Sequence, residues 1–346
     1  MTKSVLVDIT RISSGESCET GWYRPSHVKV LLLVNSSASS VTARTRVVIR
    51  KALSADHEVT LTETNRRGHA TRLAQGAAAD GTDVVVVLGG DGTLNEAANG
   101  LARTSTALAA LPGGSTNVFA RTIGLPNDPI EATGDLLDAL ERRAIRRVGL
   151  GWVNGRYFLF HVGMGYDAAV VAQVERRSGL KRYAGHPLFV YAAFATWFRH
   201  FDAKRAQFAV RFGDVGSITS SAEEVIDDGR FALCLNTNPY TFFGNRPLDI
   251  APEAVLDRGL VSVTVRSMNI VQILRIAAAA LRGGDRLRRL PYVDLRTDLS
   301  RLEVVGHGPF PYQVDGDYLG ETEHLEFRHE PAVLDLVLPD PLLSTQ

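Results

Sequence analysis

Residues 84–96 constrain the fold of this chain more than any other stretch. Residues 84–88 are apolar and mostly β-branched, which predicts a strand buried on both faces of a parallel sheet. The three glycines within residues 89–92 then allow close approach of a ligand, because glycine has no Cβ. From Leu94 onward the apolar residues recur at helical spacing. A strand, a glycine turn and a helix N-terminus present backbone N–H groups to an anion, so this stretch predicts a phosphate site.

Asp91, within the glycine turn, distinguishes this stretch from other phosphate loops. No Lys-Ser or Lys-Thr pair follows the glycines, and their spacing is not G-x-G-x-x-G, so neither a Walker A loop nor a Rossmann fingerprint is present. A carboxylate here would repel a bare phosphate, which indicates a nucleotide delivered with Mg²⁺. The alternative is a tight turn closed by the aspartate side chain.

Strands and helices alternate through the first part of the chain. Strands are predicted over residues 28–34, 58–62, 84–88 and 107–111, with helices over 42–54 and from 70 onward. This alternation predicts a parallel α/β sheet whose ligands bind at the carboxyl edge of the strands. A second glycine loop, residues 112–117, follows the fourth strand, so two loops suited to phosphate are expected at one edge.

Short strands predominate from about residue 148. An Asn-Gly pair at 154–155 predicts a type I′ hairpin turn. Further strands are expected at 207–212, 231–236, 260–266, 301–305, 312–314 and 324–328, and helices at about 167–177, 187–200 and 269–282. The predicted organisation is a flexible extension at 1–26, a Rossmann-like nucleotide-binding α/β domain at 27–147 that is rejoined by about 330–346, and a β-rich, sandwich-like second domain at 148–329.

Charge and composition narrow the range of partners. The formal net charge is zero, which argues against nucleic acid as a partner. Two cysteines, Cys18 and Cys234, suggest neither a disulfide framework nor a zinc site. No stretch reaches 18 apolar residues, so a cytoplasmic protein is expected, and a homodimer is left open. Basic residues within 176–182 precede an aromatic-rich stretch at 187–198, which suggests peripheral contact with a membrane, a solvated helix face being the alternative.

Three blocks resemble the diacylglycerol kinase family, which also includes sphingosine and ceramide kinases. They are GGDGTLNEAANG at 89–100, LPGGSTNVFAR at 111–121 and VDGD at 314–317, and the resemblance covers roughly residues 28–338. It implies transfer of phosphate from ATP, with Mg²⁺, to the hydroxyl of a lipid, diacylglycerol being the expected acceptor. It also implies that the β-rich domain at 148–329 is the lipid-substrate domain. Because the GGDG core is shared with NAD kinases, an NAD-kinase-like activity stays open, as do a sphingosine-type kinase and a nucleotide- or lipid-binding protein with little turnover.

The resemblance also implies roles for individual residues. Asp317 occupies the position of the family's catalytic glutamate, one methylene shorter, and is the expected general base. Asp91 is expected to be catalytic and, with Asp315, to hold Mg²⁺ together with ATP. The residues expected to contact the nucleotide are Thr64, Gly89, Gly90, Asp91, Gly92, Thr93, Asn95, Gly114, Ser115 and Asn117.

Three positions depart from the family pattern. Val118 replaces a carboxylate of the second glycine loop, which predicts a weaker metal–water network there. Arg258 occupies the position of a side-chain metal ligand in the second domain, so that Mg²⁺ site is expected to be lost or rearranged, with the arginine supplying the charge. Of the family's first-strand loop, Asn-Pro-x-(Ser/Ala)-Gly, only Asn35 and small residues are left.

Overall fold

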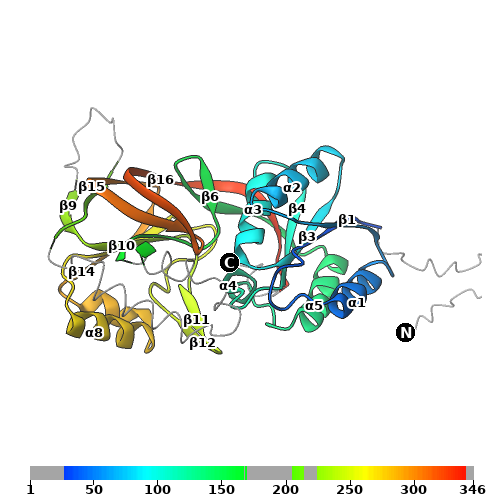
Figure 1. Ribbon diagram of the computed structural model, residues 1–346, viewed down its shortest axis with the longest axis horizontal. Helices are drawn as coiled ribbons and strands as arrows, with labels where there is room; N and C mark the ends of the chain where they lie inside the picture. Colours follow the sequence, from blue (N-terminus) through cyan, green and yellow to red (C-terminus); the bar gives the residue numbers. More distant parts are fainter. Residues whose placement is uncertain (1–26, 167, 170–204, 214–223, 340–346) are drawn as a thin grey trace, which may run out of the picture.

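A continuous sheet runs through the whole molecule in the computed structural model, which describes residues 27–166, 168–169, 205–213 and 224–339 (Figure 1). Along its main path the strand order is β14-β13-β10-β7-β15-β16-β4-β3-β1-β2. The expected extension at 1–26, the basic cluster at 176–182 and the stretch at 187–198 lie outside the described residues. None of the described helices is long and apolar enough to cross a membrane.

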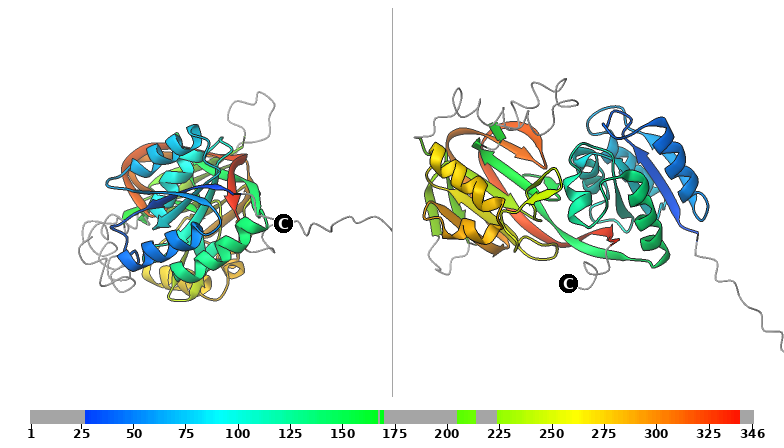
Figure 2. Two further views of the ribbon diagram at one scale, coloured as in Figure 1. Left: turned by 90° about the vertical axis from the view of Figure 1, so that its right-hand side faces the viewer. Right: turned by 90° about the horizontal axis from the view of Figure 1, so that it is seen from below.

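The first part of the chain forms the parallel end of this sheet. Its strands are β1 (Lys29–Val34), β2 (Glu58–Glu63), β3 (Val84–Gly89) and β4 (Ala107–Pro112), and its helices are α1 (Ala43–Leu53), α2 (His69–Ala79), α3 (Asp91–Leu101), α4 (Val118–Thr122) and α5 (Pro129–Glu141). α2 packs against α3 on one face and α1 against α5 on the other (Figure 2). Every residue of β3 is buried, as expected for a strand covered on both faces. The predicted α/β fold is confirmed.

The second part is β-rich and antiparallel. Its elements are β5 (Ile145–Val153), β6 (Arg156–Phe158), β7 (His161–Gly165), β8 (Phe208–Phe212), β9 (Glu224–Gly229), β10 (Phe231–Leu235), β13 (Leu260–Val265), β14 (Val293–Leu299), α8 (Ile270–Ala280), the 3₁₀ helix η1 (Gly284–Arg289) and a separate hairpin of β11 (Thr241–Phe243) and β12 (Arg246–Leu248). Side chains of β10 alternate between two hydrophobic clusters: Cys234 packs in one, and Leu233 and Leu235 in the other with α8.

Two long strands join the two parts. β15 (Arg301–Val314) and β16 (Asp317–Val337) are continuous where the sequence pattern predicts short separate strands. Register shifts interrupt their pairing and break the periodicity that the prediction relied on. β16 pairs with β15 near its start, while Leu336 pairs in parallel with Leu108 of β4 and packs in the core of the first part. β16 therefore passes from one hydrophobic core to the other.

Candidate active site

The two glycine loops pack against each other. The amide of Gly113 donates to the carbonyl of Gly89 at 2.8 Å, and a Cβ added at Gly113 would lie 2.8 Å from the Gly89 nitrogen. A Cβ at Gly114 would lie 2.8 Å from Cα of Gly90. Gly90 has φ −87°, so these glycines serve close approach of two backbones and not a left-handed turn. Helix α3 accordingly begins at Asp91, three residues before the predicted start of helical periodicity.

Asp91 fastens the first glycine loop to the second. Its Oδ2 accepts the amide of Val118 and its Oδ1 the amide of Phe119, each at 3.0 Å. These are the first two residues of α4, whose amides have no partner within the helix. The Asp91 side chain is therefore half-buried and holds α4 in place. Its role toward Mg²⁺ stays a prediction.

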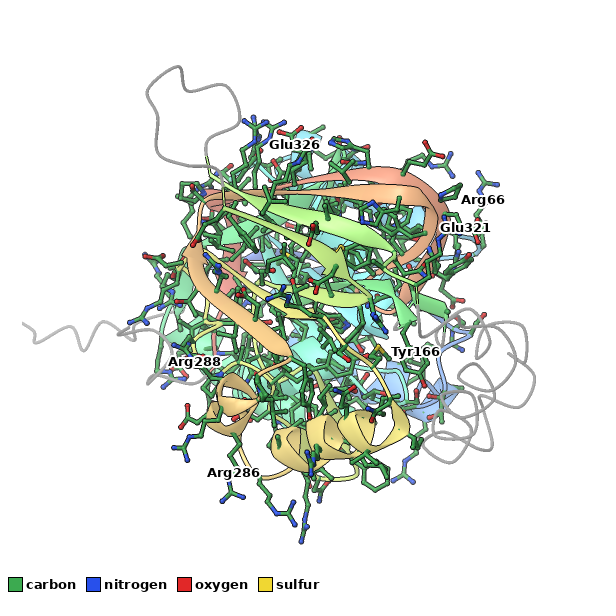
Figure 3. The ribbon with its side chains drawn as sticks, turned by 90° about the vertical axis from the view of Figure 1, so that its left-hand side faces the viewer. Arg66, Tyr166, Arg286, Arg288, Glu321 and Glu326 are labelled. Carbon is green, nitrogen blue, oxygen red and sulfur yellow. The ribbon has the colours of Figure 1, made fainter. Side chains whose placement is uncertain are left out.

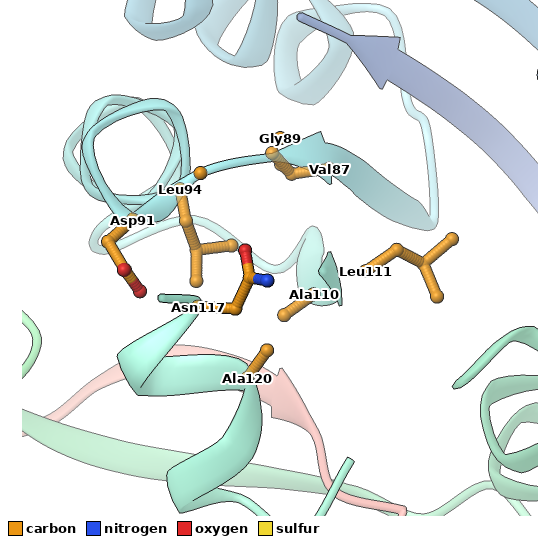
Figure 4. Close-up of a pocket in the computed structure, with 9 residues that line it drawn as sticks. Val87, Gly89, Asp91, Leu94, Ala110, Leu111, Asn117 and Ala120 are labelled. Carbon is orange, nitrogen blue, oxygen red and sulfur yellow. The ribbon is translucent and has the colours of Figure 1, made fainter. Parts of the chain in front are cut away.

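Little space is left behind the two loops. A cavity of about 10 Å³ lies there, lined in part by Asp91, Leu94, Asn117 and Ala120 (Figure 4). Such a volume holds about one water molecule. A nucleotide would therefore bind on the outer side of the loops, where Ser115 is exposed.

Asn117 closes the second glycine loop. It is buried, with φ 51°, and its Oδ1 accepts the amide of Gly114 at 2.7 Å. Its Nδ2 donates to the Gly114 carbonyl at 3.0 Å and to Asn127 Oδ1 at 2.8 Å. Its side-chain amide is already satisfied within the protein, so the contact of Asn117 with nucleotide stays a prediction that this geometry does not favour.

Asn35 links the loop after β1 to the first glycine loop. Its Nδ2 donates to Thr93 Oγ1 at 2.9 Å, and its backbone amide donates to the Leu88 carbonyl at 3.0 Å. Ser40, at the end of the same loop, donates its amide to the Gly113 carbonyl at 2.9 Å. This first loop therefore supports both glycine loops, although it lacks the proline and glycine of the family pattern.

Asp315 and Gly316 form the turn between β15 and β16. Both have positive φ, 48° and 81°, as in a type I′ hairpin turn. Asp315 is 3% exposed; its Oδ1 accepts the amides of Phe160 and His161, each at 3.0 Å. Its Oδ2 accepts the Leu159 amide and Nδ2 of Asn95, each at 2.7 Å. Burial raises the pKa of Asp315 to about 6, against the effect of these hydrogen bonds.

These contacts argue against Mg²⁺ at Asp315, a role that stays a prediction. Each of its oxygens already accepts two N–H groups, and the carboxylate faces the junction of β6 and β7. The two acids of the Asp-Gly-Asp motif point in different directions: Asp315 contacts the backbone of Phe160, whereas Asp317 lies beside Arg156. Among the described residues, no group of three or more Asp, Glu, His or Cys side chains gathers as a metal site.

Asn95 connects this turn to α3. It is 1% exposed, and its Nδ2 donates to Asp315 Oδ2 at 2.7 Å and to the Tyr157 carbonyl at 2.9 Å. Its Oδ1 accepts Nε and an Nη of Arg156, at 3.0 and 2.6 Å. The predicted contact of Asn95 with nucleotide stays a prediction, and, as for Asn117, the satisfied side-chain amide does not favour it. Its amide instead joins helix α3 to the second part of the chain.

Asp317 lies over the first turn of α3. A Cβ added at Gly92 would lie 3.4 Å from both of its carboxylate oxygens. A guanidinium nitrogen of Arg67 and one of Arg156 each lie 3.5 Å from this carboxylate. The Asp317 side chain is 24% exposed, so it can be reached from solvent. The fold thus brings an accessible carboxylate from β16 to the first glycine loop.

Thr64 lies apart from this arrangement. It is half-buried after the edge strand β2, which is separated from β3 by β1. The segment that follows is attached to α3 through Glu96, whose carboxylate accepts the amides of Gly68 at 2.8 Å and Ala70 at 3.1 Å. Glu96 was not predicted as a site residue, although it lies in the GGDGTLNE signature and could have been identified from it.

Arg67 and Arg156 were not predicted as site residues. Arg156 follows the Asn-Gly turn, for which only a hairpin was predicted, and the confirmed hairpin of β5 and β6 carries it to Asn95. Arg67 is 68% exposed and stands 250 residues from its carboxylate partner. No local pattern identifies such a pairing.

The predicted metal loop of the second part contains an ion pair. Asp257, with φ 70°, accepts the amide of Gly149 at 3.0 Å and lies 3.2 Å from an Nη of Arg146. Arg258 is exposed. The expectation that Arg258 supplies the missing charge is therefore wrong; Arg146 places a cation beside this loop.

Comparisons with known proteins show which family this chain resembles. The family model described as the diacylglycerol kinase catalytic domain matches residues 29–153. The chain is 30% identical over 321 residues to "Probable lipid kinase YegS-like" of Pseudomonas aeruginosa (strain UCBPP-PA14), covering 91% of this chain and 96% of that protein. It is 29% identical over 282 residues to "Diacylglycerol kinase" of Bacillus subtilis (strain 168), covering 79% and 84%. A solved structure of a diacylglycerol kinase from Bacillus anthracis str. Sterne has the same fold, with TM-score 0.62, 19% identity and coverage of 92% and 99%.

Proposed function

Because the chain belongs to the diacylglycerol kinase catalytic-domain family and is an ATP-dependent lipid kinase, we propose that its acceptor is diacylglycerol, which it converts to phosphatidic acid. The observation that carries the mechanism is the position of Asp317. This accessible carboxylate lies over the first turn of α3, beside the loop suited to phosphate.

Asp317 acts as the general base in this proposal. It takes the proton of the acceptor hydroxyl while the hydroxyl oxygen bonds to the γ-phosphorus of ATP and ADP leaves. Arg67 and Arg156 flank the carboxylate, and their positive charge favours an anionic phosphoryl group nearby. The positive end of the α3 dipole acts in the same direction.

The nucleotide side of the site is formed by the two glycine loops. Close contact of Gly89 and Gly113 fixes the loops relative to each other, and Asp91 fixes α4. Ser115, exposed on the second loop, offers a hydroxyl to phosphate or ribose. Asp91, the carboxylate between the two glycine loops, would hold Mg²⁺ bound to ATP together with phosphate and water oxygens, and the ion would offset phosphate charge.

A competition assay tests the acceptor. The protein is incubated with labelled ATP, Mg²⁺ and an equimolar mixture of dioleoylglycerol, sphingosine and NAD, and the products are separated. We expect label in phosphatidic acid. Label confined to sphingosine phosphate or NADP would reject diacylglycerol in favour of that acceptor, and tight Mg-ATP binding with no labelled product would indicate a binding protein.

A further inference from the structure

Helix α8 presents an apolar face to solvent. Four of the ten exposed large hydrophobic residues in the described chain lie on it or at its C-cap: Ile270, Val271, Leu274 and Leu281, with exposures of 38, 52, 55 and 52%. At about 100° per residue, Ile270, Leu274 and Leu281 fall within roughly 40° of one another. Within the helix only Ala279 and Ala280 are buried. Its most outward stripe is therefore apolar, the reverse of an ordinary surface helix.

Positive charge surrounds this stripe. Residues 270–292 hold five arginines and one acid, Asp285, whereas the whole chain has a net charge of zero. Arg275 and Arg282 are exposed along one side of α8, and the other three arginines lie on η1. Figure 3 shows Arg286 and Arg288 projecting from the molecule beside α8. Arg288 pairs with Glu253 at 2.6 Å.

We propose that α8 and η1 form a docking surface for an anionic lipid bilayer. The apolar stripe would enter the boundary between headgroups and acyl chains, and the arginines would bind anionic headgroups. A second copy of the chain fits this face less well, because a two-fold interface would bring together two rims that each hold five arginines against two acids, Asp285 and Glu253. The inference rests on the proposed function in one respect: a lipid acceptor has to be reached in a membrane.

The surface is connected to the active site. Near the C-terminal end of α8, the Ala280 carbonyl accepts the amide of Asp249, the residue that follows β12. The β11–β12 hairpin lies on the same lower side of the molecule as α8 (Figures 1 and 2). Arg121 of α4 donates to the Gly244 carbonyl of this hairpin at 3.1 Å, and its guanidinium lies 3.6 Å from the ring centroid of Phe242. Docking through α8 would therefore bring the bilayer to the hairpin that contacts α4, the helix that follows the second glycine loop.

Vesicle co-sedimentation of the full chain tests the surface. Phosphatidylcholine vesicles are compared with vesicles that also contain phosphatidylglycerol, at low and high salt. We expect at least about ten-fold stronger binding to the anionic vesicles, weakened by salt because screening shortens the range of the arginine charges. The double variant Leu274→Glu, Leu281→Glu should lose at least about ten-fold in binding. Val47→Glu, at a 67% exposed valine on α1, is the matched control and should bind like the native chain.

Charge-reversal variants test the role of the arginines independently. Arg286→Glu with Arg289→Glu should abolish the preference for anionic vesicles, whereas Arg44→Glu on α1 should not. Equal binding to both kinds of vesicle by the native chain, or unchanged binding by the α8 variant, would overturn the proposal. So would a native dimer that becomes a monomer in the α8 variant by light scattering, since a second copy would then cover the face.

Activity separates this proposal from the proposed function. Phosphorylation of a short-chain diacylglycerol dispersed in detergent should be the same for the native chain and the α8 variant, because neither leucine belongs to the active site. Vesicle binding without phosphorylation of any diacylglycerol would support the surface and reject the acceptor. Phosphorylation of the dispersed acceptor without a preference for anionic vesicles would support diacylglycerol as the acceptor and reject the docking surface.

Discussion

Two aspartates separated by one glycine have different surroundings, and this leads to different predictions for each. Asp317 is accessible beside α3, so Asp317→Asn should lower kcat by roughly 10²–10⁴, which is the usual contribution of general-base catalysis. The affinity for Mg-ATP should be unchanged. Asp317→Glu keeps a carboxylate and should retain part of the activity. Steady-state kinetics and nucleotide binding check both variants; normal turnover by Asp317→Asn would remove the base from this position.

Asp315 should matter mainly for stability. Asparagine at 315 presents an NH₂ group to N–H donors that now face a carboxylate, so Asp315→Asn should cost about 2–3 kcal/mol in the free energy of unfolding. Urea denaturation measures this cost. A normal midpoint together with a raised apparent KM for Mg²⁺ would instead restore the metal role.

His161 and Asp315 have opposite effects on stability in acid. Burial lowers the pKa of His161 to about 3, so below about pH 6.5 only the unfolded chain takes up its proton and stability falls. Asp315, with a pKa of about 6, is protonated in the folded chain between about pH 6 and pH 4, so its contribution to stability rises there as pH falls. The two contributions nearly cancel.

His161→Phe should reveal this cancellation. The difference in free energy of unfolding between His161→Phe and the native chain should rise as pH falls, by up to about 1.4 kcal/mol for each pH unit from about pH 6 to 4.5. Phenylalanine suits the position, because the native ring lies 4.9 Å from the ring centroid of Phe160 and 4.5 Å from that of Tyr240. Denaturation series across this range measure the difference; a pH-independent difference would show that His161 is protonated in the folded protein.

At the scale of elements, the structure changes what is expected of Asp91. This side chain holds α4 through two amides, so Asp91→Ala should destabilise the protein by about 1–2 kcal/mol in addition to abolishing activity. Thr45→Ala, which removes a buried hydroxyl from α1, is a comparison away from the site. Denaturation and nucleotide binding measured on the same samples separate the effects; a fully stable, inactive Asp91→Ala would indicate a role confined to Mg-ATP.

Elements with a strong local pattern could be predicted from the sequence. The apolar runs identify β1, β3 and β4, and the Asn-Gly pair identifies the hairpin of β5 and β6, because each depends on neighbouring residues. Pairings between distant residues left no such pattern. The contact of Asn95 with Asp315 spans 220 residues, so the sequence indicated polar side chains near phosphate but not that these two bind each other.

At the scale of the molecule, β16 joins Asp317 to the parallel end of the sheet. It begins at Asp317 beside α3 and ends in the first hydrophobic core, while Phe327 packs in the second. Tyr157 and Arg103 contact its midpoint: the Tyr157 hydroxyl donates to Glu330 at 2.6 Å, and Arg103 pairs with the same carboxylate at 2.6 Å. The two cores should therefore unfold together.

Ala332 offers a test of this coupling. It has φ 50° within the register shift where β16 passes between the cores, and its carbonyl accepts Nε of Arg147 at 2.8 Å. Ala332→Val places a β-branched residue in the left-handed region and should destabilise the protein by about 1–3 kcal/mol, whereas Ala332→Gly should be neutral or stabilising. Because β16 belongs to both cores, the valine variant should shift one single transition, followed by far-UV circular dichroism and by tryptophan fluorescence. Two separated transitions would show instead that the cores unfold independently, and that β16 connects them without coupling their stabilities.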